Sequence, residues 1–271
     1  SNAASETVTA SRGIITDRNG KVLVSNRLAY TLVFDRSGFD DDAALNAAIL
    51  RLVQLCEETG TGWNDTLPIG RVGNFLRYSN ARSETFDKFI EKNELTSGAS
   101  GRQLLSELRE LYHVDESLSE REARLIVGVR YELHSRDSYT FAEDVSTEVL
   151  SLITDGRYEG VTIRTASARV YNTALAAHIL GTIGPIWQEE WSSSEDTGYV
   201  GYADKGYSMN DLVGKDGVEK AFESYLRGTD GRRLITTDET GKITGELYTR
   251  EPQPGGTVAL TLDIDLQADV E

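Results

Sequence analysis

The stretch from Arg12 to Val24 reads Arg-Gly-Ile-Ile-Thr-Asp-Arg-Asn-Gly-Lys-Val-Leu-Val. Two short apolar and β-branched runs flank Asn19-Gly20, and this dipeptide is the strongest short-range signal for a β-hairpin. The sequence therefore predicts that a β-hairpin opens the fold. Residues 30–34 then alternate with a period of two, which predicts a third strand with one face turned to a core.

Helical spacing replaces this strand pattern from Asp40 onward. A first helix is predicted up to the glycines at 60 and 62, from the apolar positions Leu45, Ile49, Leu52, Val53 and Cys56. Two capping boxes, in which a hydroxyl and a longer polar side chain satisfy each other's backbone N–H groups, predict two more helices: Ser100 with Gln103, and Ser119 with Glu122. A short helix is expected from Asp144 to Ile153, closed by Asp155-Gly156.

Strand character returns at residues 161–171, so β-structure brackets the helical block. A loop of about 25 residues after Gly184 is expected to be partly helical around residues 189–191. An amphipathic helix ended by Gly228 is predicted near the C-terminus, with a core face of Val218, Ala221, Phe222, Tyr225 and Leu226. A hairpin with one buried face is predicted around Thr240-Gly241. A strand at 258–262 and a helix from Ile264 follow it.

Composition describes a folded chain with an acidic surface. The 271 residues include 44 acidic and 28 basic side chains, a net charge of −16, and 39% of them are hydrophobic. This balance excludes a strongly basic nucleic-acid binder. The apolar runs are only a few residues long, far short of the roughly 20 needed to span a bilayer.

The sequence contains one cysteine and one methionine, and each is informative. Cys56 has no second cysteine to pair with, and its place on an apolar helical stripe predicts a buried thiol. Met209 is the only methionine, and Ser1-Asn2-Ala3 is typical of a cleaved expression tag. We therefore expect an excised piece whose C-terminus is also cut, and the cut at the N-terminus leaves open that a signal or a membrane anchor was removed with the start codon.

Most familiar chemical motifs are missing from the sequence. There is no phosphate-binding loop, because Asp216 follows Gly214-Lys215 where the loop requires serine or threonine, and the sequence also lacks a G-x-G-x-x-G dinucleotide fingerprint. His113, His134 and His178 lie on separate segments, which disfavours a metal site, and we expect no cofactor. Asp263-x-Asp265 lacks the other ligands of a calcium loop. A hydrolase using paired carboxylates stays an alternative, although 44 carboxylates make coincidental pairs common.

Four sequence motifs follow one another in an order that amino-acid composition alone does not explain. They are Arg-Gly-x-Ile-x-Asp-Arg-Asn-Gly at 12–20, Ala-His-Ile-Leu-Gly-Thr-Ile-Gly at 177–184, Asp-Leu-Val-Gly-Lys-Asp-Gly-Val-Glu at 211–219 continuing through 226–231, and Pro-Gly-Gly-Thr-Val-x-Leu-Thr-Leu-Asp-x-Asp-Leu-Gln at 254–267. In this order they resemble the non-catalytic N-terminal module of class B penicillin-binding proteins, called the dimerisation or pedestal domain. The resemblance covers most of residues 12–271.

The resemblance implies a parent protein anchored in the bacterial membrane, with its bulk on the extracytoplasmic face. That parent would cross-link peptidoglycan through a serine acyl-enzyme, which requires S-x-x-K, S-x-N and K-T-G motifs. S-x-x-K and K-T-G are absent here, and Ser208-Met209-Asn210 matches S-x-N without partners. We therefore expect the active serine downstream of Glu271 and no catalytic residue in this chain.

The resemblance also implies that the motif residues pack together and against the catalytic domain. The residues concerned are Arg12, Gly13, Asp17, Arg18, Gly20, Arg169, His178, Gly181, Gly184, Gly214, Gly217, Glu219, Arg227 and Gly228. Arg12 with Glu219 is the best candidate for a bidentate lock, because guanidinium and carboxylate share a planar geometry. The alternative is independent solvated charges, since many surface ion pairs contribute nothing. The glycines are expected at turns and helix ends.

The chain differs from the family in places. Glu159 and Asn172 stand where proline is common, and the helical block carries no family motif. We predict an α+β fold in two parts, a discontinuous β-rich pedestal of residues 4–36 and 157–271 and an inserted helical head of residues 37–156.

The predicted function is non-catalytic. The pedestal would position the downstream transpeptidase domain above the membrane, and the head would dock envelope partners such as a SEDS-family glycan polymerase, with the membrane reached only through the removed anchor. The alternative is an extracellular binding or adhesion module unrelated to cross-linking.

Overall fold

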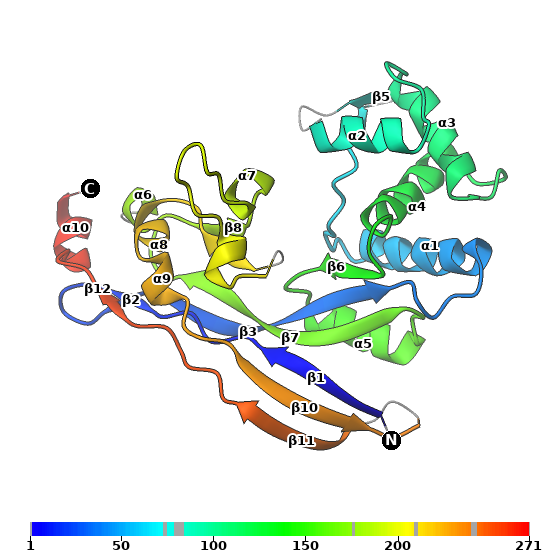
Figure 1. Cartoon of the computed structure of the whole chain (residues 1–271). Coiled ribbons are helices and arrows are strands. Elements are labelled where there is room, and N and C mark those ends of the chain that lie inside the picture. The colour runs from blue at the N-terminus through cyan, green and yellow to red at the C-terminus, as the bar shows by residue number, and fades with distance from the viewer. Residues whose placement is uncertain are drawn as a thin grey trace. The chain divides into compact units, whose positions relative to one another are not determined.

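The structure, a computed structural model, describes residues 2–72, 75–78, 84–174, 177–208, 211–239 and 243–270. The chain forms two compact units, one of Ser1–Leu28 with Ser167–Glu271 and the other of Ala29–Ala166. Both units contain helices and strands, so the predicted α+β class is confirmed. The chain passes from one unit to the other within two long strands, β3 (Val22–Asp35) and β7 (Val161–Tyr171) (Figure 1).

The β-hairpin predicted around Asn19-Gly20 is confirmed in the first unit. β2 (Ile15–Thr16) pairs antiparallel with the start of β3, and β12 (Val258–Ala259) pairs parallel with the other side of β2. Gly20 has a φ of 83°, a conformation that costs glycine little. The core beneath this sheet consists of Ile15, Leu23, Val24, Leu180, Val218, Leu226, Val258 and Ile264.

The third strand predicted at 30–34 is not separate, and this part of the prediction was wrong. β3 runs unbroken from Val22 to Asp35. Asn26, a residue that favours turns, is held in the strand by its own amide: Nδ2 donates to the Arg12 carbonyl oxygen at 2.7 Å, and Oδ1 accepts from Arg169 at 3.1 Å. These tertiary hydrogen bonds replace the turn that local sequence favours.

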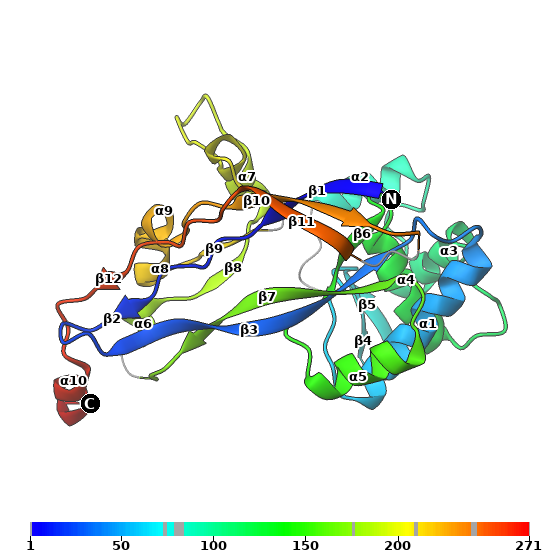
Figure 2. The ribbon, with the colours of Figure 1, turned by 90° about the horizontal axis from the view of Figure 1, so that it is seen from below.

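A second sheet in the same unit has the order β1–β10–β11. β1 (Asn2–Val8) and β11 (Ile243–Arg250) each pair antiparallel with β10 (Gly231–Thr237), and Figures 1 and 2 both show the three strands side by side. The predicted hairpin is therefore confirmed, although its turn at 240–242 lies outside the described residues. Its predicted buried face is wrong, because Leu234 is 37% exposed and Leu247 63% exposed. An alternating pattern shows that two faces differ without showing that a layer covers one of them.

Short elements complete the first unit. β8 (Ile183–Pro185) pairs with β9 (Leu212–Gly214), and the loop between them includes α7 (Gln188–Trp191), as predicted, and a 3₁₀ turn at Tyr202–Lys205. α6 (Ala177–Leu180) precedes β8. The strand predicted at 258–262 is limited to the two residues of β12, and the predicted C-terminal helix is α10 (Ile264–Val270).

The amphipathic helix predicted over 218–226 is two short helices, α8 (Gly217–Ala221) and α9 (Glu223–Leu226), separated at Phe222. Its predicted core face is only partly correct. Val218 and Leu226 are buried, but Phe222 and Tyr225 are exposed, while Glu219 and Glu223 are buried. Hydrogen-bonded carboxylates thus take the place that the apolar pattern assigned to aromatic rings.

Helices dominate the second unit around one large core. α1 (Asp42–Glu58), α3 (Gly101–Leu111) and α4 (Glu120–Glu132) appear where the sequence predicts them. Ser119 and Glu122 form both halves of a capping box. Ser100 caps α3 by accepting from the Gln103 N–H, which is one of the two hydrogen bonds of the capping box predicted for Ser100 and Gln103. The buried thiol of Cys56 belongs to this core, and burial raises its pKa to about 11.

The remaining elements of this unit include strands within the predicted helical block. β4 (Ile69–Val72) pairs with β5 (Phe75–Tyr78), and β6 (Ser138–Ala142) pairs with the end of β3. α2 (Glu84–Lys92) is a further helix. The short helix expected from Asp144 is α5 (Thr147–Gly156), which begins later because Ser146 caps it by accepting from the Val149 N–H. No helix in the described ranges has the length and hydropathy of a membrane span.

Candidate functional site: a buried arginine–glutamate cluster

Glu219, on α8, is the centre of a buried cluster in the first unit. Its side chain is fully buried, and each of its two carboxylate oxygens accepts two hydrogen bonds. Arg169 donates in a bidentate fashion, from Nε to Oε2 and from Nη2 to Oε1, both at 2.9 Å. Arg12 Nε donates to Oε1 at 3.2 Å, and the Tyr171 hydroxyl donates to Oε2 at 2.8 Å. The predicted Arg12–Glu219 contact is therefore present, but its predicted bidentate geometry is wrong, because the bidentate partner of the carboxylate is Arg169.

Arg12 connects this carboxylate to a second one. Its Nη2 donates to the Glu219 carbonyl oxygen at 3.0 Å, and its Nη1 donates to Glu223 Oε1 at 2.6 Å. Asn26 on β3 joins the two arginines, since it donates to the Arg12 carbonyl oxygen and accepts from Arg169 Nη1. We call Arg12, Asn26, Arg169, Tyr171, Glu219 and Glu223 the arginine–glutamate cluster. Two arginines and two glutamates balance its charge, which is the condition for burying charges.

Glu223 extends the cluster toward the loop between β8 and β9. It accepts from the Gly214 N–H and from the Tyr207 hydroxyl, both at 2.8 Å. The guanidinium of Arg227 lies 3.5 Å from the centroid of the Tyr207 ring and donates to the Gly206 carbonyl oxygen at 3.0 Å. A single carboxylate thus fixes a helix, a strand end and a loop relative to one another.

Local geometry explains why these side chains converge. Glu219 on α8 and Glu223 at the start of α9 are four residues apart, and the Arg12 guanidinium contacts both carboxylates. Arg169 and Tyr171 are two residues apart on β7 and therefore point to the same face of that strand. The fold thus brings the pair of glutamates together with the arginine and tyrosine of β7.

The charge states follow from burial and pairing. Burial alone would raise the pKa of Glu219, but the hydrogen bond from Arg169 and the charges of Arg12 and Arg169 lower it below its ordinary value. Burial alone would lower the pKa of Arg12, and the charges of Glu223 and Glu219 raise it instead. Burial and the hydrogen bond to Glu219 raise the pKa of Tyr171, which keeps its hydroxyl a neutral donor. The cluster is thus held in its charged form.

Two of the predicted glycines permit close backbone approach around the cluster. The Gly13 N–H donates to the Leu226 carbonyl oxygen at 2.7 Å, and a Cβ on Gly13 would lie 1.9 Å from the Gly256 carbonyl oxygen. A Cβ on Gly214 would lie 2.1 Å from the Glu219 carbonyl oxygen. No side chain fits either position without a backbone shift. The other predicted glycines lie at turns, at a helix start or end, or in β8: Gly20, Gly181, Gly184, Gly217 and Gly228.

Four of the predicted residues with ionisable side chains lie outside the cluster, and one of them, Arg227, contacts Tyr207 as described above. Asp17 is buried, and its carboxylate accepts the backbone N–H groups of Asn19, Lys21 and Ile264. Burial opposes ionisation of Asp17, and these N–H donors outweigh it and lower its pKa. Arg18 and His178 have exposed side chains. Three members of the cluster were not among the predicted site residues: Asn26, Tyr171 and Glu223. The four-residue spacing of Glu219 and Glu223 is the signal that points to Glu223.

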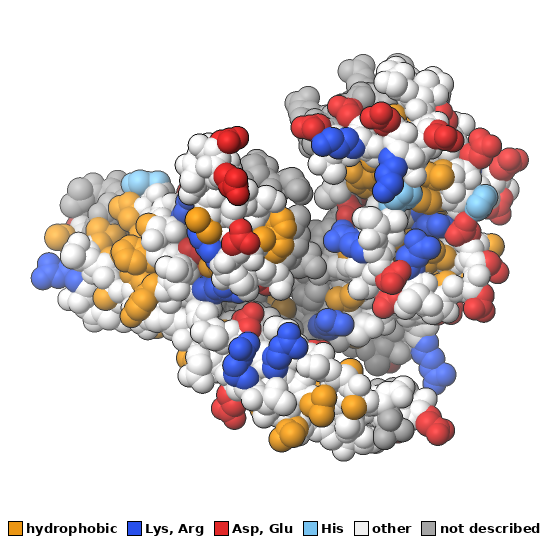
Figure 3. All heavy atoms as spheres, in the orientation of Figure 1, with side chains coloured by type: hydrophobic (Ala, Val, Ile, Leu, Met, Phe, Trp, Pro, Cys, Tyr) orange, Lys and Arg blue, Asp and Glu red, His pale blue; other side chains and the backbone are white. Residues whose placement is uncertain are grey.

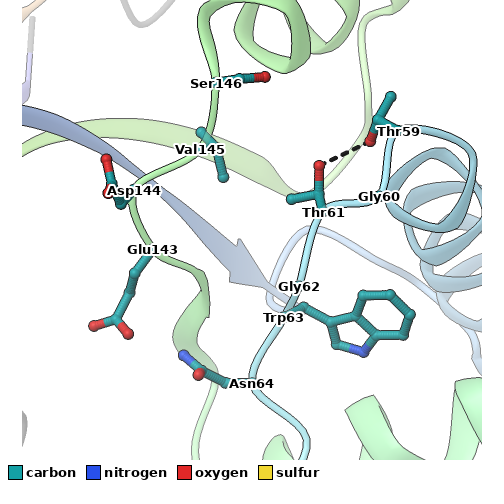
Figure 4. A pocket seen from close by; sticks show the side chains of 10 residues that line it. All are labelled: Thr59, Gly60, Thr61, Gly62, Trp63, Asn64, Glu143, Asp144, Val145 and Ser146. Carbon is teal, nitrogen blue, oxygen red and sulfur yellow. Dashed lines mark hydrogen bonds between the residues drawn. The ribbon is translucent and has the colours of Figure 1, made fainter.

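A pocket of about 540 Å³ lies in the second unit, between residues 59–64 and 143–146. Figure 4 shows the side chains of Glu143 and Asp144 turned away from Thr61. Thr61 accepts or donates a hydrogen bond with Thr59, at 2.8 Å. The two carboxylates therefore do not converge on a common point, as an acid–base pair in a hydrolase would.

Comparison with known families decides what kind of chain this is. The family described as the penicillin-binding protein dimerisation domain matches residues 7–260. The chain belongs to this family. It is a dimerisation domain of penicillin-binding proteins, and the resemblance stated from the sequence motifs is confirmed.

Relatives of this dimerisation domain are cell-wall proteins. It is 28% identical to penicillin-binding protein 2A of Bacillus subtilis over 96% of this chain and 37% of that protein. It is 34% identical to the peptidoglycan D,D-transpeptidase MrdA of Acinetobacter baumannii over 41% of this chain and 16% of that protein. The chain thus spans well under half the length of these relatives.

Solved structures show the same fold. Penicillin-binding protein 2B of Streptococcus pneumoniae aligns with 99% of this chain and 43% of its own, with a TM-score of 0.55 and 22% identity. A structure described as the complex between penicillin-binding protein 2 and MreC from Helicobacter pylori aligns with 99% of this chain and 38% of its own, with a TM-score of 0.54 and 18% identity.

Proposed function

We propose that this dimerisation domain is the pedestal of a class B penicillin-binding protein. It joins a membrane anchor to a transpeptidase domain on the extracytoplasmic face of the membrane and holds that domain in place for peptidoglycan cross-linking. The division into a pedestal, residues 4–36 and 157–271, and a head, residues 37–156, belongs to this proposal.

The observation that carries the proposal is the arginine–glutamate cluster. Arg12 and Glu219 are 207 positions apart in the sequence, yet they share a buried ion pair to which Arg169 adds a third segment. A buried ion pair contributes little net stability, but it disfavours alternative packings that leave a charge unpaired. Such a device suits a rigid spacer, whose task is to keep distant segments in one arrangement.

The N-terminal and C-terminal segments are also fixed to each other near the first hairpin. β2 pairs parallel with β12, the Arg18 N–H donates to the Leu262 carbonyl oxygen at 2.8 Å, and Lys21 Nζ lies 2.8 Å from Asp265. In the proposed parent, this arrangement would transmit the position of the anchor to the domain that follows α10. The motif residues around the cluster would then form the contact with that domain.

Partners are proposed by analogy with the relatives. The Helicobacter pylori relative is described in a complex with MreC. We propose that the head of this domain docks envelope proteins of the same kind, including a SEDS-family glycan polymerase. A polymerase within the membrane and a cross-linking domain outside it must be held in register, and a rigid pedestal does so without chemistry of its own.

Fluorescent penicillin tests the non-catalytic part of this proposal. The chain of residues 1–271 should remain unlabelled, whereas the parent protein should be labelled on a serine encoded within an S-x-x-K motif beyond Glu271. Covalent labelling of the chain itself, or a coding sequence without this motif downstream, would overturn the assignment.

A further inference from the structure

The sheet β1–β10–β11 has two faces of different character. On one face Arg233 forms ion pairs with Glu6, at 2.6 Å, and with Glu246, at 3.1 Å. On the other face two rows of residues lie in register across the three strands. They are Thr7, Arg232 and Arg250 in one row and Ser5, Leu234 and Leu247 in the next. We call these six residues the Arg232 face.

The Arg232 face is basic and apolar without a counter-charge. Its six residues are all exposed, and none of them is acidic. Among the described residues, neither Arg232 nor Arg250 has an ion pair with a carboxylate, and the Arg232 guanidinium donates to the Ser5 hydroxyl oxygen at 3.3 Å. In the view of Figure 3, basic and hydrophobic side chains lie next to each other over this sheet. This is unusual in a chain whose net charge is −16.

The pairing of Arg232 with Arg250 is unfavourable for the isolated sheet. Like charges directly opposite each other on neighbouring strands destabilise a sheet, and the ladder is irregular between Arg232 and Arg233. The opposite face shows that this same sheet accommodates compensating glutamates. The uncompensated arginines and the exposed leucines beside them therefore suit an external group that supplies carboxylates and apolar surface.

We infer that the Arg232 face is a docking site for one acidic amphipathic segment of another protein. In the bound state, carboxylates of that segment would pair with Arg232 and Arg250 while its apolar side chains cover Leu234 and Leu247. This inference does not rest on the proposed pedestal function.

Size favours a single segment as the occupant. β1 and β10 have seven residues each, so with three strands about 4.8 Å apart and about 3.4 Å per residue one whole side of this sheet measures roughly 350 Å², and the Arg232 face is part of it. A standard protein–protein interface buries about 800 Å² on each partner, so this face fits one helix or strand rather than a whole domain.

Charge favours a protein segment over a lipid surface. Docking on anionic lipid relies on clusters of about 4–8 basic residues. The Arg232 face has two arginines, on a chain with a net charge of −16 that an anionic membrane repels. Two fixed guanidinium groups flanked by leucines are better matched by a few carboxylates at fixed positions.

Site-specific photo-crosslinking tests the inference in the protein as the cell makes it. A benzophenone amino acid replaces Leu247, and the neighbouring Tyr248, on the opposite face and also exposed, gives the control position. We expect an adduct at 247 whose crosslinked peptide is an acidic amphipathic segment, and little adduct at 248. In the double variant Arg232→Glu with Arg250→Glu, the adduct at 247 should fall by about tenfold or more, as expected for reversal of two interface arginines.

The double variant is a matched control for folding, because two glutamates preserve a like-charge pair across the strands. Its melting temperature should equal that of the wild type. An absent adduct at 247, an adduct that survives the double reversal, or a crosslinked segment without acidic residues would overturn the inference. So would binding of the purified chain to phosphatidylglycerol vesicles that the double reversal abolishes, since a lipid surface would then be the occupant.

Discussion

Arg12 and Glu219 are joined through both the side chain and the backbone of the glutamate. Arg12 Nε donates to the carboxylate at 3.2 Å, and Nη2 of the same guanidinium donates to the Glu219 carbonyl oxygen at 3.0 Å. The contact therefore orients α8 as well as neutralising its carboxylate. Arg169, which is 3% exposed, holds the same carboxylate from β7.

Removal of the Glu219 carboxylate should strongly destabilise the first unit. Glu219→Ala leaves the buried guanidinium groups of Arg12 and Arg169 without their shared acceptor, and breaking a buried pair in this way costs about 3–5 kcal/mol. Urea unfolding of the chain measures the free energy of unfolding. Glu246→Ala, which removes a partly exposed partner of Arg233 in the same unit, should cost less than about 1 kcal/mol. Equal losses for the two variants would mean that burial of the cluster has no energetic role.

The stability contributed by Glu219 should depend on pH. Its pKa in the folded chain lies below the ordinary value of 4.5, so its contribution is fully present above pH 4.5 and is lost as the pH falls through the lowered value. Melting temperatures of the wild type and of Glu219→Gln, measured between pH 3 and pH 7, should differ most at pH 7 and converge in acid. A constant difference over this range would be inconsistent with a lowered pKa at Glu219.

Gly13 should tolerate no side chain. In Gly13→Ala the new Cβ would lie 1.9 Å from the Gly256 carbonyl oxygen, and both residues are held in place by their backbone N–H groups, which donate to the carbonyl oxygens of Leu226 and Tyr225. Overpacking of this kind costs about 1–3 kcal/mol. Gly38→Ala is the comparison, because a Cβ there has no neighbour within 4 Å and the residue lacks a positive φ; its free energy of unfolding should change by no more than about 0.5 kcal/mol. A neutral Gly13→Ala would show that the backbone separates easily at this point.

Arg250→Glu should stabilise the isolated chain. The change replaces a like-charge pair with an opposite-charge pair across β10 and β11, which is worth about 0.2–1 kcal/mol. Thermal unfolding at low and high salt measures the gain and its electrostatic part. A lower melting temperature for Arg250→Glu would indicate that Arg250 already has a favourable partner, and it would weaken the assignment of the Arg232 face as a docking site.

The local elements were largely predictable, because their signals lie within a few neighbouring residues. Asn19-Gly20 predicted the first turn, and the spacing of Ser119 and Glu122 predicted the start of α4. The errors arose where tertiary contacts override local preference. Asn26 stays in β3 because Arg12 and Arg169 satisfy its amide, and this partnership is invisible to a local pattern.

The candidate site was predictable only in part, for a related reason. Arg12, Arg169 and Glu219 belong to recognised motifs, and the resemblance to the family implied that the motifs of Arg12 and Glu219 pack together. Periodicity placed Phe222 and Tyr225 in the core, because it treats apolar residues as buried and carboxylates as exposed. Glu223 is buried instead, since Arg12, Gly214 and Tyr207 together satisfy its oxygens.

The central claim is that this domain contributes position and no chemistry to cross-linking. Its most direct test compares fluorescent penicillin labelling with peptidoglycan cross-linking in cells that depend on the parent protein, with the amount of protein measured by immunoblot. In the Glu219→Ala parent, labelling per molecule should remain at the wild-type level while cross-linking falls, and the Glu246→Ala parent should retain both. Wild-type cross-linking by the Glu219→Ala parent, or loss of its labelling per molecule, would contradict the claim.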